Sequence, residues 1–410
     1  MKSQNLSPQI ILFMTVFLYL LGFGVMIPLI PHLSRDMGAT STEAGLLMAT
    51  YSLMQFLFAP LWGRWSDRIG RRKILLFSLA MESVSYLAFA FARQLETLFL
   101  ARALTGFFGA SLSTANAAMA DVTSAKDRSK GMALIGAAFG LGFILGPAIG
   151  GGAAVVADQI SQAPFFRTTF VSLLVSGVFA LTFVFAYFKL PETLPEDRRQ
   201  TKSRRRWAGL FEKLKTPVTR ELILAFFLVS FAMSSMEATL VYFMADRFFW
   251  NLKDTSFGFA YIGLVLVFTQ GYLVRRFLPR FGERHILVVA LPVFVAGLAL
   301  IAPADSITVM ALSMTLIALG VGHANPSLNG SISLMAHESE QGSTLGLTQS
   351  LSSLGRILGP AAGGALYAWS AGAPFWFSTA LAFAAWILIL SRYRSLPERA
   401  ISPKDPTRRP

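Results

Sequence analysis

Five ionisable side chains lie inside long apolar stretches of this sequence, where their charges would have little access to water. They are Glu82, Arg102, Glu237, His323 and Arg356. A charge in such surroundings is costly unless it is paired or faces water, so each of the five is a candidate functional residue. A carboxylate there can hold either a proton or a cation, and this indicates a chemistry of exchanging one for the other.

The sequence neighbours of Glu237 are suited to contacting varied organic molecules. Met233, Met236 and Tyr242 flank it, and methionine and aromatic side chains form a deformable apolar wall. The polar candidates elsewhere in apolar stretches are His323, Asn325, Asn329 and Asn116. His323 titrates near neutral pH when unperturbed, but a histidine in an apolar helix can also be a packing residue with a satisfied hydrogen bond.

The sequence carries no signature of an enzyme or of an ATP-driven pump. It contains no cysteine, which excludes disulfides, thiol catalysis and cysteine-based metal sites. It also has no HExxH, Gly-x-Ser-x-Gly or P-loop motif and no closely spaced pair of carboxylates. We therefore expect neither catalysis nor a bound metal or organic cofactor.

Long apolar helices must hold the candidate residues. Of the 410 residues, 54% are hydrophobic, 14% are charged and 36 are phenylalanine, and the mean hydropathy is +0.56. Since a membrane-spanning helix needs about 20 mainly apolar residues, twelve such helices account for most of the chain. The predicted helices are residues 10–31, 42–62, 74–92, 96–120, 131–156, 167–189, 221–245, 255–277, 285–303, 307–335, 343–370 and 374–393. The predicted fold class is an all-α polytopic membrane protein whose first helix is not a cleaved signal peptide.

Two near-copies of a glycine-rich heptapeptide indicate an internal duplication. Leu145–Gly151 reads LGPAIGG, and 213 residues later Leu358–Gly364 reads LGPAAGG. Glycine at every fourth position bares one helix face, so another helix can approach it backbone to backbone. The expected seam residues are Gly142, Gly146, Pro147, Gly150, Gly355, Gly359, Pro360 and Gly363. Because duplicated halves are usual in secondary transporters, we expect Gly146 and Gly359 where the two halves slide against each other.

The placement of the basic residues gives the orientation and the domain boundaries. Alternate loops hold 29 Lys and Arg residues on one side of the membrane and 5 on the other. This bias places both termini in the cytoplasm and explains the net charge of +14 without nucleic-acid binding. We predict a six-helix half at 1–189, a linker at 190–220, a second six-helix half at 221–393 and a cytoplasmic tail at 394–410.

The linker and the tail each begin near a Leu-Pro-Glu sequence, at Leu190–Glu192 and Leu396–Glu398. The linker also has apolar residues at helical spacing, which are Trp207, Leu210, Phe211 and Leu214. This pattern predicts a short helix in the cytoplasmic membrane interface, although a solvated linker fits it equally well.

Four motifs resemble those of a known family. Gly63–Lys73, GRWSDRIGRRK, resembles the loop motif G-x-x-x-D-R-x-G-R-R/K of the major facilitator superfamily, and Arg102–Ala110 resembles its R-x-x-x-G-x-x-G-A motif. Gly142–Gly151 is similar to the G-x-x-x-G-P-x-x-G-G motif of the drug:proton antiporters, and Gly22–Pro31 to their G-x-x-x-x-x-P-x-x-P element. Gly63–Gly151 is most similar to the 12-span tetracycline-efflux group. The resemblance implies two pseudo-symmetric six-helix halves around a central cavity.

The resemblance also implies a conformational latch at the cytoplasmic surface. Its residues would be Gly63, Asp67, Arg68, Gly70, Arg71, Arg72 and Asp121. The glycines would permit a tight turn, Asp67 would approach the start of the eleventh helix near residues 342–344, and Asp121 would pair with Arg71 or Arg72. Charges that only fix the topology are the alternative interpretation.

The same resemblance implies a role for each of the candidate residues in the spans. The substrate cavity would be lined by Glu237, Met233, Met236, Tyr242, Asn116, His323, Asn325 and Asn329. Proton coupling would fall to Glu237, Arg102 and Glu82, with Glu237 ahead of Glu82 because the third helix usually supports the cavity from outside. A purely structural role is the alternative for Glu82, Arg102 and Arg356. The tetracycline-efflux group has an acidic residue where this chain has Ser85, so the sequence does not assign tetracycline as substrate.

The sequence therefore predicts a proton-coupled exporter of amphipathic or cationic small molecules that works by alternating access and needs no cofactor. A proton-coupled transporter of a polar metabolite, such as a sugar or an amino acid, is the alternative. A channel is a further alternative that the paired glycine seams disfavour. We expect a monomer in a bacterial inner membrane, with small-molecule substrate, protons and lipid as its partners.

Overall fold

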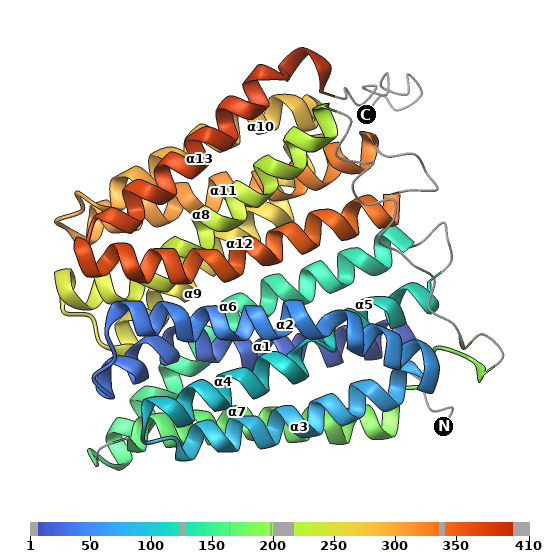
Figure 1. The fold of residues 1–410 in the computed structure, drawn as a ribbon, viewed down its shortest axis with the longest axis vertical. Coiled ribbons are helices and arrows are strands. Elements are labelled where there is room, and N and C mark those ends of the chain that lie inside the picture. The colour runs from blue at the N-terminus through green and yellow to red at the C-terminus, as the bar shows by residue number, and fades with distance from the viewer. Residues whose placement is uncertain are drawn as a thin grey trace, which may run out of the picture. The chain divides into compact units, whose positions relative to one another are not determined.

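The computed structural model describes residues 7–123, 128–163, 165–196, 199, 217–335 and 341–396. Within these ranges the chain is almost wholly helical and contains no strand (Figure 1). The predicted interfacial helix with Trp207, Leu210, Phe211 and Leu214 lies outside the described residues, as does the tail from residue 397 onward.

The chain folds into two compact units. Unit 1 contains residues 1–204, 237–264 and 356–371, and unit 2 contains residues 205–236, 265–355 and 372–410. Unit 1 thus includes two segments that follow the predicted linker. The predicted division into residues 1–189 and 221–393 stays a prediction.

Unit 1 is a layer of long helices. Its complete helices are α1 (Pro8–Asp36), α2 (Ser41–Ile69), α3 (Arg71–Phe91), α4 (Leu95–Gly109), α5 (Leu112–Asp121), α6 (Arg128–Ile160) and α7 (Phe166–Lys189). Parts of α8 (Pro217–Phe248), α9 (Leu252–Phe268) and α12 (Gln341–Trp369) complete it. Helix α1 packs against α6, α2 against α4, and α3 against α7. Polar pairs support this apolar packing, as where the hydroxyls of Ser83 and Ser176 lie 3.0 Å apart between α3 and α7.

Unit 2 holds the remaining helices. They are a π-helical turn (Thr269–Leu273), α10 (Val274–Ile301), α11 (Ile307–Met335), α13 (Ala373–Ser391) and a short 3-10 turn (Tyr393–Ser395). Helix α10 packs against α11 and α13. Gly282 interrupts α10 with a φ of +72°, a conformation that glycine adopts without strain. This interruption falls between the predicted helices 255–277 and 285–303. In the structure one non-helical glycine takes the place of the predicted loop.

Ten segments of the described chain are long and apolar enough to cross a membrane. One of them, Leu252–Ile301, is 50 residues long and covers two predicted helices. Helix α12 is 29 residues long but falls outside this group, because its many serine and glycine residues lower its hydropathy. The structure confirms the all-helical polytopic fold, while length and apolarity alone do not reproduce the count of twelve spans.

The predicted span 96–120 is present as the apolar segment Leu95–Asp121, which a turn at Ala110 and Ser111 divides into α4 and α5. Side chains from α2 and α3 occupy the backbone carbonyls at the break. Trp62 Nε1 donates to Phe107 O at 2.7 Å, Ser78 Oγ to Phe108 O at 2.6 Å, and Gln55 Nε2 to Gly109 O at 3.3 Å. Carbonyls that lose their helical partners are tolerated at membrane depth because other side chains bind them.

Helix α2 continues beyond the predicted end at residue 62. It runs to Ile69, so Gly63 lies inside a helix, with open space where a Cβ would stand, and does not form the expected turn. The turn is made by Gly70 alone, which has a φ of +104°. Only glycine adopts this conformation readily, so Gly70 is the residue that lets α3 begin at Arg71.

The glycine repeat of α6 packs as closely as predicted, but Gly146 meets a helix of its own predicted half instead of the other half. A Cβ on Gly146 would lie 2.6 Å from the Cα of Gly24, and the nearest atoms to Gly142 and Gly150 belong to Leu20 and Val25. All three partners are on α1, within the predicted first half. In unit 2, the nearest atoms to Gly355 are likewise backbone atoms of Phe227 and Phe231 on α8.

Contacts between segments of the two predicted halves use a neighbouring face of the same helices. On α6, Gly151 lies against Ser256 of α9, and Ile144 lies against Gly263. On α12, Gly364 meets Gly45 of α2, where a Cβ on either glycine would lie 3.1 Å from the Cα of the other. Successive residues turn by about 100° around a helix, so residues four apart lie on nearly the same face. The glycine repeat therefore carries no information about contacts made by the neighbouring face of the helix.

Candidate functional site

Unit 1 encloses a buried polar cluster around Glu82, which we call the Glu82 cluster. It consists of Tyr19 on α1, Tyr51 and Gln55 on α2, Glu82 on α3 and Arg102 on α4. Tyr19 Oη donates to Glu82 Oε1 at 3.4 Å, and the hydroxyls of Tyr19 and Tyr51 lie 3.2 Å apart. Gln55 Nε2 donates to the Tyr51 hydroxyl at 3.4 Å. A chain of hydrogen-bonding groups therefore runs from α3 through α1 to α2.

Glu82 and Arg102 face the same cluster without a direct ion pair. Glu82 is 1% exposed and Arg102 3% exposed, and no ion pair within 4.0 Å joins these two described residues. The guanidinium of Arg102 instead stacks on the Tyr51 ring, with its central carbon 4.5 Å from the ring centroid. Such cation–π contacts strengthen when they are desolvated, so Tyr51 links the cation to the hydroxyl chain that ends at Glu82.

Gly109 makes room for this cluster. A Cβ there would lie 2.5 Å from the Tyr19 hydroxyl, 2.9 Å from the Tyr51 hydroxyl and 3.1 Å from Glu82 Oε1. Because Gly109 of the Arg102–Ala110 motif has no side chain, the Tyr19 hydroxyl, the Tyr51 hydroxyl and Glu82 Oε1 can all approach the backbone beside the turn between α4 and α5. Tyr19, Tyr51 and Gln55 were not among the candidates from sequence, because tyrosine and glutamine at helical spacing are common in packed helices. Only the contact with Glu82 and Gly109 distinguishes them.

Glu237 lies on α8, and the charged group that acts on it is Arg356 of α12. Both residues belong to unit 1 and both are partly buried. The interpretation of Arg356 as a structural residue that holds backbone or a carboxylate stays a prediction. Glu82 likewise has a cation nearby, Arg102, but it also accepts a hydrogen bond from the Tyr19 hydroxyl.

The other predicted cavity residues are distributed over both units. Asn116 on α5 is partly buried in unit 1, while Met233 and Met236 on α8 belong to unit 2. In unit 2, His323 Nδ1 lies 2.8 Å from Leu319 O, and its ring stacks on Phe277. Asn329 Nδ2 donates to Asn325 O at 3.1 Å. His323 therefore has the backbone hydrogen bond and the aromatic neighbour of a packing residue, and its place on a substrate cavity stays a prediction.

Tyr242 is buried against α1, and its place on a substrate cavity stays a prediction. Its hydroxyl lies 3.0 Å from Ser34 Oγ and donates to Pro31 O at 3.3 Å. It belongs to a group of contacts at the end of unit 1 where α1 and α8 end, which we call the His32 end. There Arg35 pairs with Asp246 at 2.7 Å, and Tyr367 donates to the other oxygen of Asp246 at 2.8 Å.

Further polar contacts at the His32 end join the same elements. His32 Nε2 lies 3.1 Å from Thr255 Oγ1 on α9, and Ser41 Oγ donates to Gly364 O at 3.1 Å. Together with the Gly45–Gly364 contact, they tie α1 and α2 to α8, α9 and α12. At this end, segments of both predicted halves are therefore joined within one compact unit.

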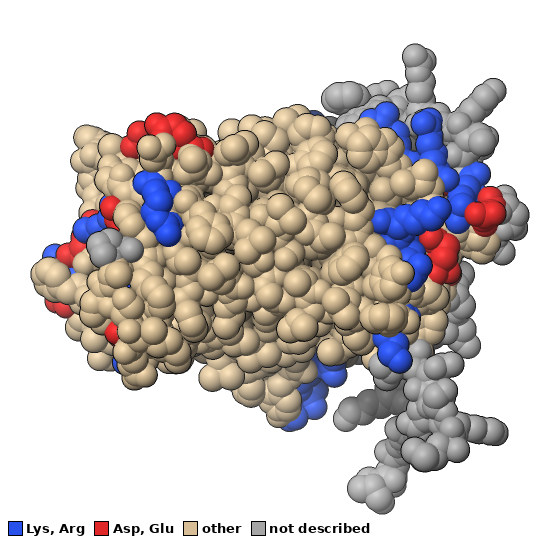
Figure 2. All heavy atoms as spheres, turned by 90° about the horizontal axis from the view of Figure 1, so that it is seen from below, with Lys and Arg blue, Asp and Glu red and all other residues tan. Residues whose placement is uncertain are grey.

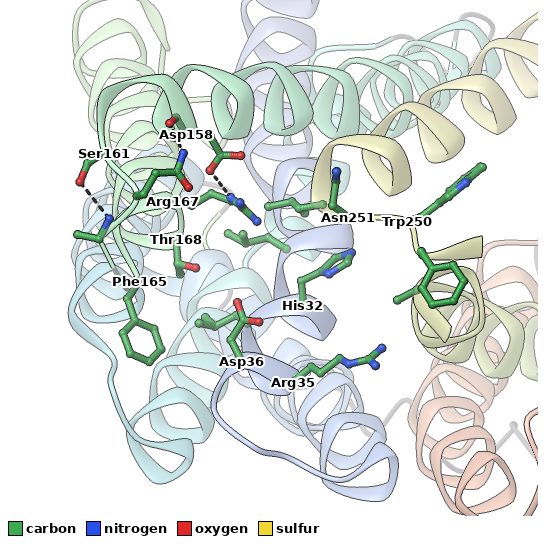
Figure 3. A pocket seen from close by; sticks show the side chains of 17 residues that line it. His32, Arg35, Asp36, Asp158, Ser161, Phe165, Arg167, Thr168, Trp250 and Asn251 are labelled. Atoms are coloured by element: carbon green, nitrogen blue, oxygen red, sulfur yellow. Dashed lines mark hydrogen bonds and ion pairs between the residues drawn. The ribbon is translucent and has the colours of Figure 1, made fainter. Parts of the chain in front are cut away.

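A pocket of about 470 Å³ lies at the His32 end (Figure 3). Its charged and polar lining includes His32, Arg35, Asp36, Asp158 and Arg167, and the last two form an ion pair at 2.6 Å. Aromatic residues complete the wall, namely Phe165, Phe249 and Trp250. Phe165 and Phe249 have φ values of +63° and +57°, and they are the two non-glycine residues with positive φ in the described chain.

At the opposite end of α2 and α3, Arg71 gathers the ionic contacts of the predicted latch. Arg71 Nη1 pairs with Asp67 at 2.6 Å and donates to Ser66 Oγ at 2.6 Å, and Arg71 Nε pairs with Asp121 at 3.1 Å. The expected partnership of Asp121 with Arg71 is present. Arg72 instead donates to Tyr187 O at 2.6 Å, and Arg68 is exposed. The expected approach of Asp67 to residues 342–344 stays a prediction.

Basic side chains gather at this second end, which we call the Asp67 end. Figure 2 shows a face of the molecule on which a belt with few charges separates a mostly basic group, with a few Asp and Glu, from a second group of mixed charges. The exposed basic residues of the Asp67 end include Arg64, Arg68 and Lys73. The belt matches the surface that apolar lipid chains require.

Known proteins resemble this chain along nearly its whole length. The sequence matches the description Major Facilitator Superfamily over residues 12–281 and 276–410. The tetracycline resistance protein, class B, of Escherichia coli is 32% identical over 98% of this chain and 99% of its own. The chain belongs to the major facilitator superfamily. Multidrug resistance protein 1 of Bacillus subtilis is 29% identical to this superfamily member, over 92% of this chain and 94% of its own.

Solved structures agree with the membership. The human organic anion transporter MFSD10 (TETRAN) is 27% identical and superposes with a TM-score of 0.70, covering 93% of this chain and 98% of its own. The nucleoside transporter NupG, at 13% identity and a TM-score of 0.74, covers 95% of this chain and 99% of its own, and it supports the fold alone. This superfamily member is thus an integral membrane transporter of small molecules, as its motifs predicted.

Proposed function

We propose that the chain is a proton-coupled exporter of amphipathic or cationic small molecules. The observation that carries this proposal is the full-length similarity to tetracycline and multidrug resistance proteins. That similarity favours drug export over the transport of a sugar or an amino acid. The proton gradient would supply the energy, and the chain would act as a monomer in a bacterial inner membrane, with both termini in the cytoplasm.

The contacts at the His32 end support alternating access. In the orientation given by the basic residues, this end faces the outside of the cell. Arg35–Asp246, Tyr242–Ser34 and His32–Thr255 would then close the outer side, and they would have to separate before substrate could leave. The Arg71 network is present together with these contacts, so closure of the inner side in the opposite state would require the predicted approach of Asp67 to residues 342–344.

Glu237 is the carboxylate that we propose for exchange of a proton against a cation. It is partly buried and has Arg356 as its counter-charge, so a proton or a cationic substrate would each alter the same balance of charges. Glu82 is shut away at 1% exposure, where a substrate cation cannot reach it in this structure. We therefore assign Glu82 and Arg102 a supporting part in proton movement, through the hydroxyls of Tyr19 and Tyr51.

Tetracycline itself is one candidate among several substrates. At the position where the tetracycline exporters have an acidic residue, Ser85 donates its hydroxyl to Met81 O at 2.7 Å within α3. A hydroxyl that is bound to its own helix cannot replace a carboxylate as a partner for a cation. A broader range of cationic and amphipathic compounds is therefore the expected substrate class.

A growth-inhibition panel tests the proposed function. Cells that express the chain are compared with cells that do not, over many toxic cationic, amphipathic and polar compounds, tetracycline among them. We expect resistance to several amphipathic cations, and saturable uptake of the same compounds into everted vesicles that collapses when the pH gradient is removed. Unchanged sensitivity to all cations, together with gradient-driven transport of a sugar or an amino acid, would establish the alternative function.

A further inference from the structure

The Leu-Pro-Glu sequence after α7 makes a contact that neither the latch nor the cavity explains. Glu192 reaches back to the start of α3, where its Oε1 accepts a hydrogen bond from the backbone N–H of Arg71 at 2.9 Å. The same oxygen accepts from the N–H of Leu194 at 3.1 Å, which folds the segment around the carboxylate. Residues 121 positions apart in the chain are joined in this way.

The start of α3 needs such a partner. The first N–H groups of any helix have no acceptor within the helix, and Gly70 has no side chain that could provide one. Gly70 also leaves the space that Glu192 uses, because a Cβ there would lie 2.9 Å from the carboxyl carbon of Glu192. An anion at a helix N-terminus is further stabilised by the helix dipole.

The segment that carries Glu192 is anchored on both sides. Leu190 is 3% exposed and Leu194 is 9% exposed. Tyr187, three residues before Leu190, accepts a hydrogen bond from Arg72 at its carbonyl, and its ring lies 5.6 Å from the Arg72 guanidinium carbon. Tyr187 and Glu192, near the end of α7 and just after it, therefore contact two consecutive residues at the start of α3, Arg72 and Arg71.

The duplication repeats this arrangement in unit 2. The pattern Tyr-x-x-Leu-Pro-Glu occurs at residues 187–192 and again at 393–398. Tyr393 lies under Arg284, with the guanidinium carbon 3.7 Å from the ring centroid, and Leu396 is 4% exposed. Arg284 stands two residues after Gly282, as Arg72 stands two residues after Gly70, and both glycines have positive φ. The described part of the repeat thus makes the same contact twice, while Glu398 lies outside the described residues.

We propose that Glu192 is a positioning residue for the Arg71 network. Its carboxylate caps α3 and fixes the backbone from which Arg71 reaches Asp67 and Asp121. The six-residue repeat would then be a clamp between the last helix of each predicted half and the start of that half's third helix. A loose first turn would let the Arg71 guanidinium leave its two carboxylates.

Amide hydrogen exchange in purified protein tests the cap directly and needs no substrate. Glu192→Ala should speed exchange in the first turn of α3 by about fivefold, the effect of losing a typical helix cap. Glu192→Gln should exchange like the wild type, because its amide oxygen can still accept from Arg71. Glu196→Ala is the matched control, since that side chain is 86% exposed and pairs with Arg199 within the described part of the same segment. Unchanged exchange in Glu192→Ala, or equal exchange in the Ala and Gln variants, would overturn the proposal.

Transport measurements test the positioning of Arg71, and this arm rests on the proposed export activity. If Glu192 acts through Arg71, combining Glu192→Ala with Asp121→Asn should lower the transport rate no further than the more damaging single change does. Glu192→Gln should restore most of the rate. Independent, multiplying losses, or normal transport in Glu192→Ala, would show a cap without a positioning role. If the wild type moves none of the test compounds, the proposed function fails while the exchange result still decides the cap.

Discussion

At the scale of single residues, Arg71 carries the largest share of the ionic contacts at the Asp67 end. Its side chain is 9% exposed, while those of its partners Asp67 and Asp121 are 34% and 25% exposed. A cation that is this deeply buried depends on both carboxylates, because few waters can replace either of them.

Asp67→Asn should therefore reduce transport about tenfold or more while expression and membrane insertion remain normal. The change leaves a buried guanidinium with one carboxylate instead of two, and an imperfectly compensated buried group costs about 1–3 kcal/mol or more. Transport into everted vesicles, normalised to protein level, measures the effect. Asp305→Asn is the control, since Asp305 is exposed and has no ion pair in the described chain. Near-normal transport in Asp67→Asn would leave these charges with a topological role alone.

The two buried carboxylates should behave differently when each is neutralised. Glu237→Gln keeps the shape but removes the charge that balances Arg356, so substrate-induced proton release should disappear. Glu82→Gln should reduce release less, because the Tyr19 hydroxyl that donates to Glu82 Oε1 can also donate to an amide oxygen. The measurement is proton release from purified protein on adding substrate, titrated from about pH 6 to 9, a range that spans the usual shifts of buried carboxylates. The reverse ranking would move the coupling site to α3.

The sequence could identify the charged members of the site but not its neutral ones. A charge in an apolar helix is rare enough to stand out alone, as Glu82, Arg102, Glu237 and Arg356 do. Tyr19, Tyr51 and Gln55 can be recognised as site residues only from their contacts with side chains on other helices. Glu192 was visible as part of a repeated tripeptide, yet its partner, the N–H of Arg71, belongs to the backbone and has no sequence signature.

At the scale of elements, helix positions followed from apolar length, while contacts between helices did not. The interruption between α4 and α5 depends on Trp62, Ser78 and Gln55, which lie on other helices. The glycine repeat predicted a close approach, but every helix of the bundle was a candidate partner. The structure assigns α1 to the Gly142–Gly150 face, and α9 to the face with Gly151.

A pair of alanine substitutions on α6 tests the close approach. Gly146→Ala should destabilise the protein by about 1–3 kcal/mol, because the new methyl would lie 2.6 Å from the Cα of Gly24, where backbone has to move. Gly152→Ala, with nothing within 4 Å of its new Cβ, should be neutral or gain up to about 1 kcal/mol from lower chain entropy. Thermal unfolding in detergent compares the two variants. Equal melting temperatures would mean that α1 and α6 do not touch at this level.

At the scale of the whole molecule, the absence of cysteine makes every introduced thiol unique. Ser34 is 0% exposed beneath Tyr242, so Ser34→Cys reports whether the His32 end is closed. Adding Asp246→Asn removes the partner of both Arg35 and Tyr367, and thiol labelling should become about two- to fivefold faster. This increase in labelling rate corresponds to the free energy that an exposed ion pair with one further hydrogen bond contributes to the closed state. No change in rate would mean that these contacts do not hold the end shut.

The same approach tests the orientation of the chain. Ser370→Cys, at the His32 end, should react with a membrane-impermeant maleimide in intact cells, because Ser370 is exposed just after α12. Arg64→Cys, at the Asp67 end, should react only after the cells are permeabilised. The opposite pattern would place the basic loops outside and remove the argument that the His32 end is the exit for substrate.

The two phenylalanines in left-handed backbone at the His32 end give its closed arrangement an energetic consequence. A non-glycine residue held at such a φ raises the energy of the state that contains it by about 1–3 kcal/mol. Phe165 stands directly before α7 and Phe249 directly after α8, so a change of φ at either residue would reorient the adjoining helix. If opening of the His32 end returns either residue to negative φ, the strain of the closed state is relieved. Opening, and with it substrate release, then becomes faster. Glycine at either position would remove this stored energy, so the carrier would remain closed to the outside for longer and turn over more slowly.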